Sequence, residues 1–218
     1  MTGMGNGTIG IALVDNDIWS ARMLSQWIEQ ASVDFRMRWC THSSADALHR
    51  CLFGRNAPDV LIVDMALNDI SGDVVCKRIR RRNDDIGLLC ITAYPTERYE
   101  RDAIEAGAQG LLSKECLVKE LPAAIVRAAR GLPMDDRFLD AAAAHEMMQR
   151  GEAMRSMLSD RERDVLRRYM RGDATAQIAV ALRVSPNTVF TYIHRILRKL
   201  HVSTRNEAMA ICRKYDLV

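Results

Sequence analysis

Four residues that could share one chemical task stand at the ends of separate apolar segments. Asp15 follows "TIGIALV", Asp64 closes "VLIVD", Thr92 closes "IGLLCIT" and Lys114 follows "QGLLS". Two carboxylates, a hydroxyl and an ammonium suit a phosphoryl acceptor, in which one Asp attacks phosphorus, the other helps to hold Mg²⁺, and Lys and Thr stabilise the transferred oxygens. Each residue alone has an ordinary structural explanation as a cap, strand or surface residue. Their coincidence at four segment ends favours a shared site.

The elements that must position these residues follow a regular alternation. In residues 8–130, five short apolar segments alternate with five amphipathic ones. The apolar segments are nearly continuous Val, Ile and Leu, which predicts strands buried on both faces and therefore a parallel sheet covered by helices. We predict a doubly wound α/β domain. Such sheets bind ligands beyond the carboxyl ends of their strands, where the four polar residues fall.

Composition limits the class of protein. Of 218 residues, 48% are apolar and 27% are charged, as in globular domains. No apolar run reaches the roughly 18 residues of a membrane span. The Gly-rich first eight residues lack the pattern of a signal peptide, so we expect a cytoplasmic protein that makes no membrane contact. The six cysteines form no CxxC pair, which favours reduced thiols over disulfides or zinc.

Charge is distributed unevenly along the chain. Residues 155–218 contain 13 basic and six acidic side chains, a net charge of +7, whereas residues 1–130 contain 16 basic and 17 acidic ones. A basic C-terminal unit behind a near-neutral one is typical of a nucleic-acid-binding protein with a separate controlling domain. The basic run "KRIRRR" at residues 77–82 is expected to be solvated. Residues 131–154 begin with Gly and Pro and continue with weakly apolar sequence, which predicts a semi-rigid linker.

The C-terminal unit contains a helix with two different faces. In "SPNTVFTYIHRILRKL", Ser185 is a natural N-cap and Pro186 suits the first helical position. At 100° per residue the aliphatic side chains form one stripe, and the opposite face carries Asn, Thr, His and Arg without any acidic residue. Such a face is either solvated or bound to a polyanion. Only three residues separate a short helix predicted at residues 175–182 from Pro186. The two helices are therefore predicted to form a helix-turn-helix within an all-α four-helix unit at residues 155–218.

The first 130 residues resemble the receiver domain of two-component response regulators. The resemblance is carried by Asp15 in "LVDND", Asp64 in "LIVDM", Gly72, Thr92 in "ITA" and Lys114 in "GAQGLLSKE". It implies a five-stranded sheet of flavodoxin-like order 2-1-3-4-5. It also implies that Asp64 is phosphorylated with the help of Thr92 and Lys114. The implied Mg²⁺ ligands are Asp15, Asn16, Asp64 and the backbone carbonyl of Ala66.

The chain departs from the receiver pattern at several positions. Asn16 stands where a second acidic residue usually ligates Mg²⁺, and its uncharged amide predicts weaker metal affinity. Asp17 either compensates for this or caps the helix that starts at Ile18. Asn68 replaces the usual Pro in the loop after the phosphorylation site. Leu111 occupies the switch position, where an aromatic ring usually moves with the Thr, so this receiver either signals by another route or signals less.

The C-terminal unit resembles the LuxR-type DNA-binding domain in "LSDRERDVL", "IAVAL", "SPNTVFTYIHRILRKL" and "STRNEA". Joined to a receiver, it is identified as a member of the NarL/FixJ family of response regulators, in which residues 186–200 enter the major groove of double-stranded DNA. The candidate contact residues are Asn187, Thr188, Phe190, Thr191, Tyr192, His194, Arg195, Arg198 and Lys199. Phe190 either packs inward or touches a thymine methyl group. Arg195, Arg198 and Lys199 are expected to bind phosphates whatever the sequence.

Three hypotheses for function follow. The first is a DNA-binding transcriptional regulator, not an enzyme, that takes a phosphoryl group on Asp64 from a sensor histidine kinase and then forms an active homodimer. The second keeps DNA binding but makes the receiver a phosphorylation-independent docking and dimerisation module. The third is a flavodoxin-like enzyme or small-molecule binder, and the lack of a Gly-rich phosphate loop after the first strand argues against it.

Overall fold

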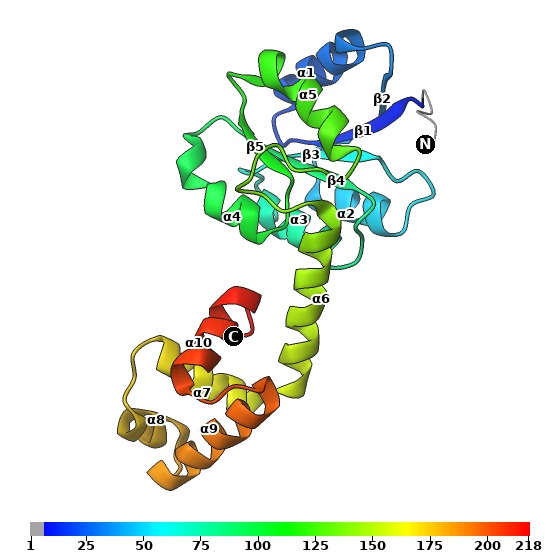
Figure 1. Ribbon diagram of the computed structural model, residues 1–218. Helices are drawn as coiled ribbons and strands as arrows, with labels where there is room; N and C mark the ends of the chain where they lie inside the picture. The colour runs from blue at the N-terminus through cyan, green and yellow to red at the C-terminus, as the bar shows by residue number, and fades with distance from the viewer. Residues whose placement is uncertain (1–6) are drawn as a thin grey trace, which may run out of the picture. The chain divides into compact units, whose positions relative to one another are not determined.

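The computed structural model describes residues 7–218 and divides into two units (Figure 1). One unit runs to Glu146 and the other from Met147 to Val218. The first six residues of the Gly-rich N-terminal segment lie outside the described part of the chain.

The first unit is built on a sheet of five parallel strands. They are β1 (Ile9–Val14), β2 (Phe35–Thr41), β3 (Val60–Asp64), β4 (Gly87–Thr92) and β5 (Gly110–Ser113). Their order is β2-β1-β3-β4-β5, and each neighbouring pair is parallel. Every residue of β3 and β4 is buried, as expected for strands covered on both faces. The predicted doubly wound fold and its strand order are confirmed.

Five helices cover the two faces of this sheet (Figure 1). They are α1 (Ile18–Ala31), α2 (Ser44–Leu52), α3 (Gly72–Arg80), α4 (Glu100–Glu105) and α5 (Leu117–Ala128). The apolar side chains of α1 and α5 form one core with one face of the sheet, and those of α2, α3 and α4 form a second core on the other face. The helix predicted from "ERYERDAIEAG" is divided into a 3₁₀ turn at Thr96–Arg98 and the short α4, and Gly107 then turns the chain with a φ of 72°.

The end of α3 differs from the prediction of a solvated basic run. Arg80 is fully buried, and its guanidinium donates hydrogen bonds to the carbonyls of Gly107, Asn83 and Ile86 and to Oε1 of Gln109, at 2.7–3.1 Å. Burial lowers the pKa of Arg80 to about 10. The buried guanidinium therefore connects the end of α3 to the segment that precedes β5.

The first part of the predicted linker packs on the first unit. The Met134 N–H donates to the Gln109 carbonyl at 2.7 Å, and Phe138 is 5% exposed within the core formed with α2, α3 and α4. Helix α6 (Ala141–Met157) follows, and the ring of His145 contacts the Arg80 carbonyl at 2.6 Å. The boundary between the units falls inside α6, after Glu146, because these buried contacts bind residues 131–146 to the sheet.

The second unit is a small bundle that continues from α6. Its further helices are α7 (Asp160–Met170), α8 (Thr175–Leu182), α9 (Pro186–Leu200) and α10 (Arg205–Tyr215). Capping boxes begin α7 at Ser159 and α10 at Thr204, and the Ser185 hydroxyl caps α9. Only three residues join α8 to α9, so the predicted helix-turn-helix is present around one apolar core.

Candidate functional site

Two carboxylates and one ammonium meet at the carboxyl edge of the sheet. Asp15 follows β1 and Asp64 ends β3, which are neighbouring strands. Lys114 follows β5, and its Nζ donates to Asp15 Oδ2 at 2.7 Å and to Asp64 Oδ2 at 2.9 Å. Asp15 is fully buried and Asp64 is 5% exposed, so solvent screens these charges little. One lysine therefore bridges both predicted acidic residues.

The charge state of Lys114 follows from this pairing. Burial disfavours the ammonium, but the hydrogen bonds to Asp15 and Asp64 outweigh it and raise the pKa of Lys114 above its usual value. Ser20, on the first turn of α1, joins the cluster because its hydroxyl donates to Asp15 Oδ2 at 2.9 Å and lies 3.3 Å from Lys114 Nζ. Ser20 was not predicted, and its only sequence signal is its place in a helix turn directly after Asp15.

Thr92 lies at the end of the strand next to Asp64. It is buried on β4, which pairs with β3 on one side and with β5 on the other. Its backbone carbonyl accepts the Lys114 N–H at 2.7 Å, and its hydroxyl accepts the Tyr94 N–H at 3.1 Å. The structure thus joins Asp15, Asp64 and Lys114 directly and places Thr92 on the adjacent strand end.

The oxygen groups at this edge fit a hard cation such as Mg²⁺. Two carboxylates lie together, and the half-buried Asn16 follows Asp15 directly with an amide oxygen that carries no charge. Asp64 Oδ1 accepts the Ala66 N–H at 3.0 Å, which holds the turn that carries the Ala66 carbonyl. Within residues 7–218, no group of three or more His, Cys, Asp or Glu side chains gathers as a metal site. The donor set is therefore two carboxylates supplemented by neutral oxygens.

Asp17 is the N-cap of α1, which was one of the two alternatives predicted for it. Its carboxylate accepts the N–H groups of Ser20 and Trp19, and these bonds lower the pKa of Asp17. Gly72 is required by close packing, because a Cβ there would lie 2.3 Å from the Asp64 carbonyl oxygen. Leu111 is half-buried against the core on the α4 side, where it packs as an aliphatic side chain.

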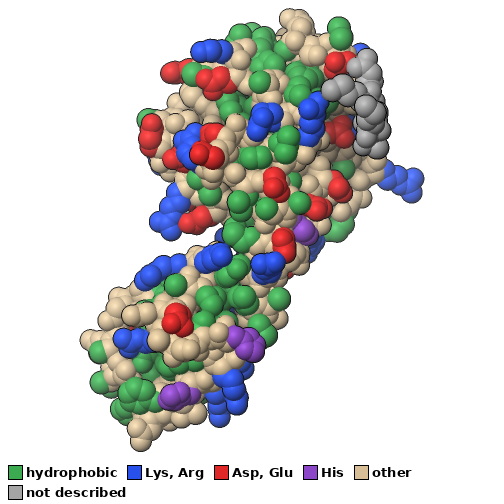
Figure 2. Space-filling view, viewed as in Figure 1, with side chains coloured by type: hydrophobic (Ala, Val, Ile, Leu, Met, Phe, Trp, Pro, Cys, Tyr) green, Lys and Arg blue, Asp and Glu red, His purple; other side chains and the backbone are tan. Residues whose placement is uncertain are grey.

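Helix α9 presents a polar and basic face to solvent. Its buried stripe is Val189, Ile193, Ile196 and Leu200. Its exposed candidate residues are Asn187, Phe190, Thr191, His194, Arg195 and Arg198. Figure 2 shows Lys and Arg side chains over the visible face of this unit, with few acidic ones. This matches the charge that the sequence assigns to residues 155–218 and is the electrostatic pattern of a nucleic-acid-binding surface.

Three of the predicted contact residues are engaged within the domain. Lys199 Nζ donates to Glu162 Oε2 at 2.6 Å, and this carboxylate is 3% exposed. Burial opposes ionisation of Glu162, but the bonds from Lys199 and Ser159 outweigh it and lower its pKa. Thr188 contributes to the cap through the Ser185 hydroxyl, and Tyr192 is half-buried against the core. Lys199 therefore forms an ion pair inside the domain.

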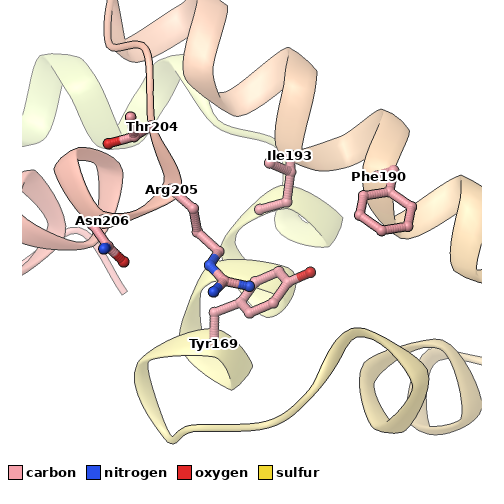
Figure 3. Close-up of a pocket in the computed structure, with 6 residues that line it drawn as sticks. All are labelled: Tyr169, Phe190, Ile193, Thr204, Arg205 and Asn206. Atoms are coloured by element: carbon pink, nitrogen blue, oxygen red, sulfur yellow. The ribbon is translucent and has the colours of Figure 1, made fainter.

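Phe190 lies outward on α9. It is 52% exposed and borders a hollow that Ile193, Tyr169 and Arg205 also line (Figure 3). The sequence left two positions open for this ring, packed inward or touching a thymine methyl group, and the observed exposure shows that it is not packed inward.

Comparison with known proteins identifies both units. Residues 11–126 match the response regulator receiver domain family, and residues 156–212 match the LuxR family of bacterial regulatory proteins. The fold and its acidic site therefore define a receiver joined to a helix-turn-helix domain. The chain belongs to the NarL/LuxR-type family of DNA-binding response regulators, as the sequence motifs predicted.

Individual relatives and solved structures agree with this family assignment. The chain is 32% identical over 159 residues to the probable transcriptional regulatory protein NarL of Mycobacterium tuberculosis, which covers 73% of this chain and 74% of the relative. It is 36% identical over 172 residues to the DNA-binding transcriptional activator DevR/DosR of the same species, with 76% of each chain covered. The response regulator RcsB in its complex with DNA shares the fold at a TM-score of 0.53, with 17% identity over 95% of this chain and 99% of that one. In the part that the structure describes, no helix is long and apolar enough to span a bilayer.

Proposed function

We propose that this response regulator accepts a phosphoryl group on Asp64 from a phosphohistidine of a sensor kinase. The observation that carries this proposal is the bridge from Lys114 to both Asp15 and Asp64. In the transfer, an oxygen of Asp64 forms a bond to phosphorus while the bond between phosphorus and the histidine nitrogen breaks, and the bonding pair returns to the imidazole. The protein then acts as a regulator that is modified, not as an enzyme with its own substrate.

The residues around Asp64 have separable roles in this proposal. Lys114 neutralises an oxygen of the incoming group, and the Thr92 hydroxyl, on the adjacent strand end, donates to another. Asp15, Asn16, Asp64 and the Ala66 carbonyl would hold Mg²⁺. When bound, Mg²⁺ neutralises charge between the carboxylates and the phosphoryl oxygens. Ser20 fixes the orientation of Asp15 through its hydroxyl.

Phosphorylation would act on the second unit by changing charge. A phosphoryl group adds about −1.5 to −2 charges at neutral pH, which would bias a two-state receiver toward a homodimer that binds DNA. Asn16 and Leu111 support an alternative, because one weakens the metal site and the other removes the aromatic switch. In that alternative the receiver is a docking and dimerisation module that works without phosphate.

The second unit would read double-stranded DNA through α9. We propose Arg195 and Arg198 as phosphate contacts and Asn187, Thr191 and His194 as groups that face the base edges. Phe190 supplies an apolar contact suited to a thymine methyl group. Because the ligand is chromosomal DNA, the proposed site of action is the cytoplasm.

Phosphate-affinity electrophoresis with a small-molecule phosphodonor and Mg²⁺ tests the acceptor. We expect one shifted band in the wild type and none in Asp64→Ala, with the shift retained in Asp85→Asn, which changes an exposed acidic residue. A shift that survives Asp64→Ala would refute the assignment. DNA footprinting with and without phosphodonor then separates the two forms of regulation, because phosphate-independent binding predicts equal occupancy for wild type and Asp64→Ala.

A further inference from the structure

The helices packed against α9 are α7, α8 and α10, and they differ in charge. A helix in the major groove, which is about 12 Å wide, has a sugar-phosphate backbone on each side, so cations on neighbouring elements commonly add to those of the helix itself. Helix α8, with the sequence "TAQIAVAL", contains no charged residue. Cations beside α9 must therefore come from the turn after α8, which carries the exposed Arg183, and from the other helices of the domain.

The first turn of α10 carries such a cation. Arg205 is exposed, and its guanidinium carbon lies 4.8 Å from the centre of the Tyr169 ring (Figure 3). Tyr169 is itself held in place, because its hydroxyl lies 2.9 Å from Thr175 Oγ1 and the residue is only 7% exposed. The ring holds the guanidinium in place by a cation–π contact, which uses none of its N–H groups as hydrogen-bond donors to an anion.

Arg205 and α9 share one concave surface. A hollow of about 300 Å³ is lined by Tyr169 of α7, by Phe190 and Ile193 of α9, and by Thr204, Arg205 and Asn206 at the start of α10. Phe190 is the outward ring of the proposed DNA-binding face. Arg205 therefore lies across the hollow from that face and not on a remote surface.

The charge of Arg205 is not neutralised by a carboxylate. In residues 7–218, the structure gives it no ion pair, whereas Arg163, Arg167 and Arg168 each pair with an Asp. The nearby Glu207 accepts the backbone N–H groups of Ser203 and Thr204 as the cap of α10. The arginine is positioned by an aromatic ring yet has no anion.

We propose that Arg205 binds a DNA phosphate beside the groove that α9 enters, and that Tyr169 is its positioning residue. This proposal rests on the proposed DNA binding by α9 and extends the binding surface from α9 to the first turn of α10. The ligand group is a backbone phosphate, so the contact carries no base preference.

The salt dependence of binding tests the contact. Fluorescence anisotropy of the full chain with a labelled mixed-sequence duplex, in the presence of a small-molecule phosphodonor and a constant Mg²⁺ concentration and between 50 and 200 mM NaCl, yields the slope of log K against log salt. Loss of one phosphate contact lowers the magnitude of that slope by about 0.9. We expect this in Arg205→Ala and in Arg205→Gln, which keeps a planar side chain without charge. Arg213→Ala, which changes an exposed cation in the last turn of α10, should keep the wild-type slope.

Each outcome separates this inference from the function on which it depends. A wild-type protein that does not bind the duplex, or binds without salt dependence, would refute the proposed DNA binding by α9. A steep wild-type slope that is unchanged in Arg205→Gln refutes only the Arg205 contact. For Tyr169, we expect Tyr169→Leu to weaken binding by about two- to fivefold, as for loss of an exposed cation–π contact. The same change should have no further effect in the Arg205→Gln background, whereas a general structural role would weaken binding in both.

Discussion

Replacing Arg80 with methionine should unfold the receiver at lower denaturant concentration. Methionine fills a similar volume but donates no hydrogen bond, so the acceptors around the guanidinium are left behind. Two of them keep a partner, because Gln109 Oε1 still accepts the Leu88 N–H and the Gly107 carbonyl still accepts the Gln109 amide. The carbonyls of Asn83 and Ile86 lose the partner that the structure gives them.

The expected cost follows from these two orphaned carbonyls. An unsatisfied buried acceptor costs about 1–3 kcal/mol, and only the Ile86 carbonyl is buried while that of Asn83 is partly exposed, so the loss should be about 2 kcal/mol. Relief of the buried charge acts in the opposite direction, but it dominates only when the surrounding polar groups are replaced as well. A loss of this size is a large part of the 5–15 kcal/mol typical of a folded domain.

Urea unfolding followed by tryptophan fluorescence measures this effect in the full chain. The three tryptophans, Trp19, Trp27 and Trp39, all belong to the first unit, so their signal reports that unit. Arg78→Met, which changes an exposed residue of the same helix, serves as control and should stay within about 0.5 kcal/mol of the wild type. An Arg80→Met protein within 1 kcal/mol of the wild type by the same criterion would refute the reasoning.

Three further predictions concern the ion pair of the DNA-binding unit, its acid stability and the metal site. Lys199→Met should lower the unfolding free energy of the helical unit by about 1–3 kcal/mol, because Glu162 is left buried without its charged partner. The salt slope of DNA binding should stay unchanged in this variant. Arg195→Met, in contrast, should lower the magnitude of that slope by about 0.9. Because the pKa of Glu162 is held below its usual 4.5, the carboxylate stabilises the fold above about that pH and the contribution is lost as pH falls through the lowered value. Urea unfolding followed by circular dichroism should therefore show a stability difference between the wild type and Lys199→Met that is full at neutral pH and narrows as pH falls below about 4.5. Asn16→Asp should tighten Mg²⁺ binding by on the order of tenfold or more, measured by the fluorescence of Trp19 on the adjacent helix.

Each of these three predictions has an outcome that would refute it. A Lys199→Met protein with a reduced salt slope would return Lys199 to the set of phosphate contacts. A stability difference between the wild type and Lys199→Met that does not narrow in acid would show that the pair does not hold Glu162 ionised. Mg²⁺ binding unchanged by Asn16→Asp would remove position 16 from the metal site.

Local sequence was sufficient to predict the elements and the ends of the receiver strands. Apolar segments of Val, Ile and Leu predicted buried parallel strands, and parallel strands bring their carboxyl ends to one edge, so Asp15 and Asp64 could be expected to meet. The first residue of α9 could also be predicted from the sequence, because Ser185 and Pro186 act within one helical turn. These features depend on neighbours close in the chain or on the period of the side chains.

Only the tertiary structure decided which long side chains are used inside the protein. Arg80 stands in a basic run that the sequence suggests is solvated, yet it is buried because the carbonyls of Asn83 and Ile86 in the following loop and of the distant Gly107 surround its guanidinium. Lys199 reads as a phosphate contact, yet Glu162, 37 residues earlier, pairs with it. Arginine and lysine reach over many ångströms and can bury their stems while the head group finds a partner. The partner is set by packing between elements, which neither periodicity nor spacing in the sequence records.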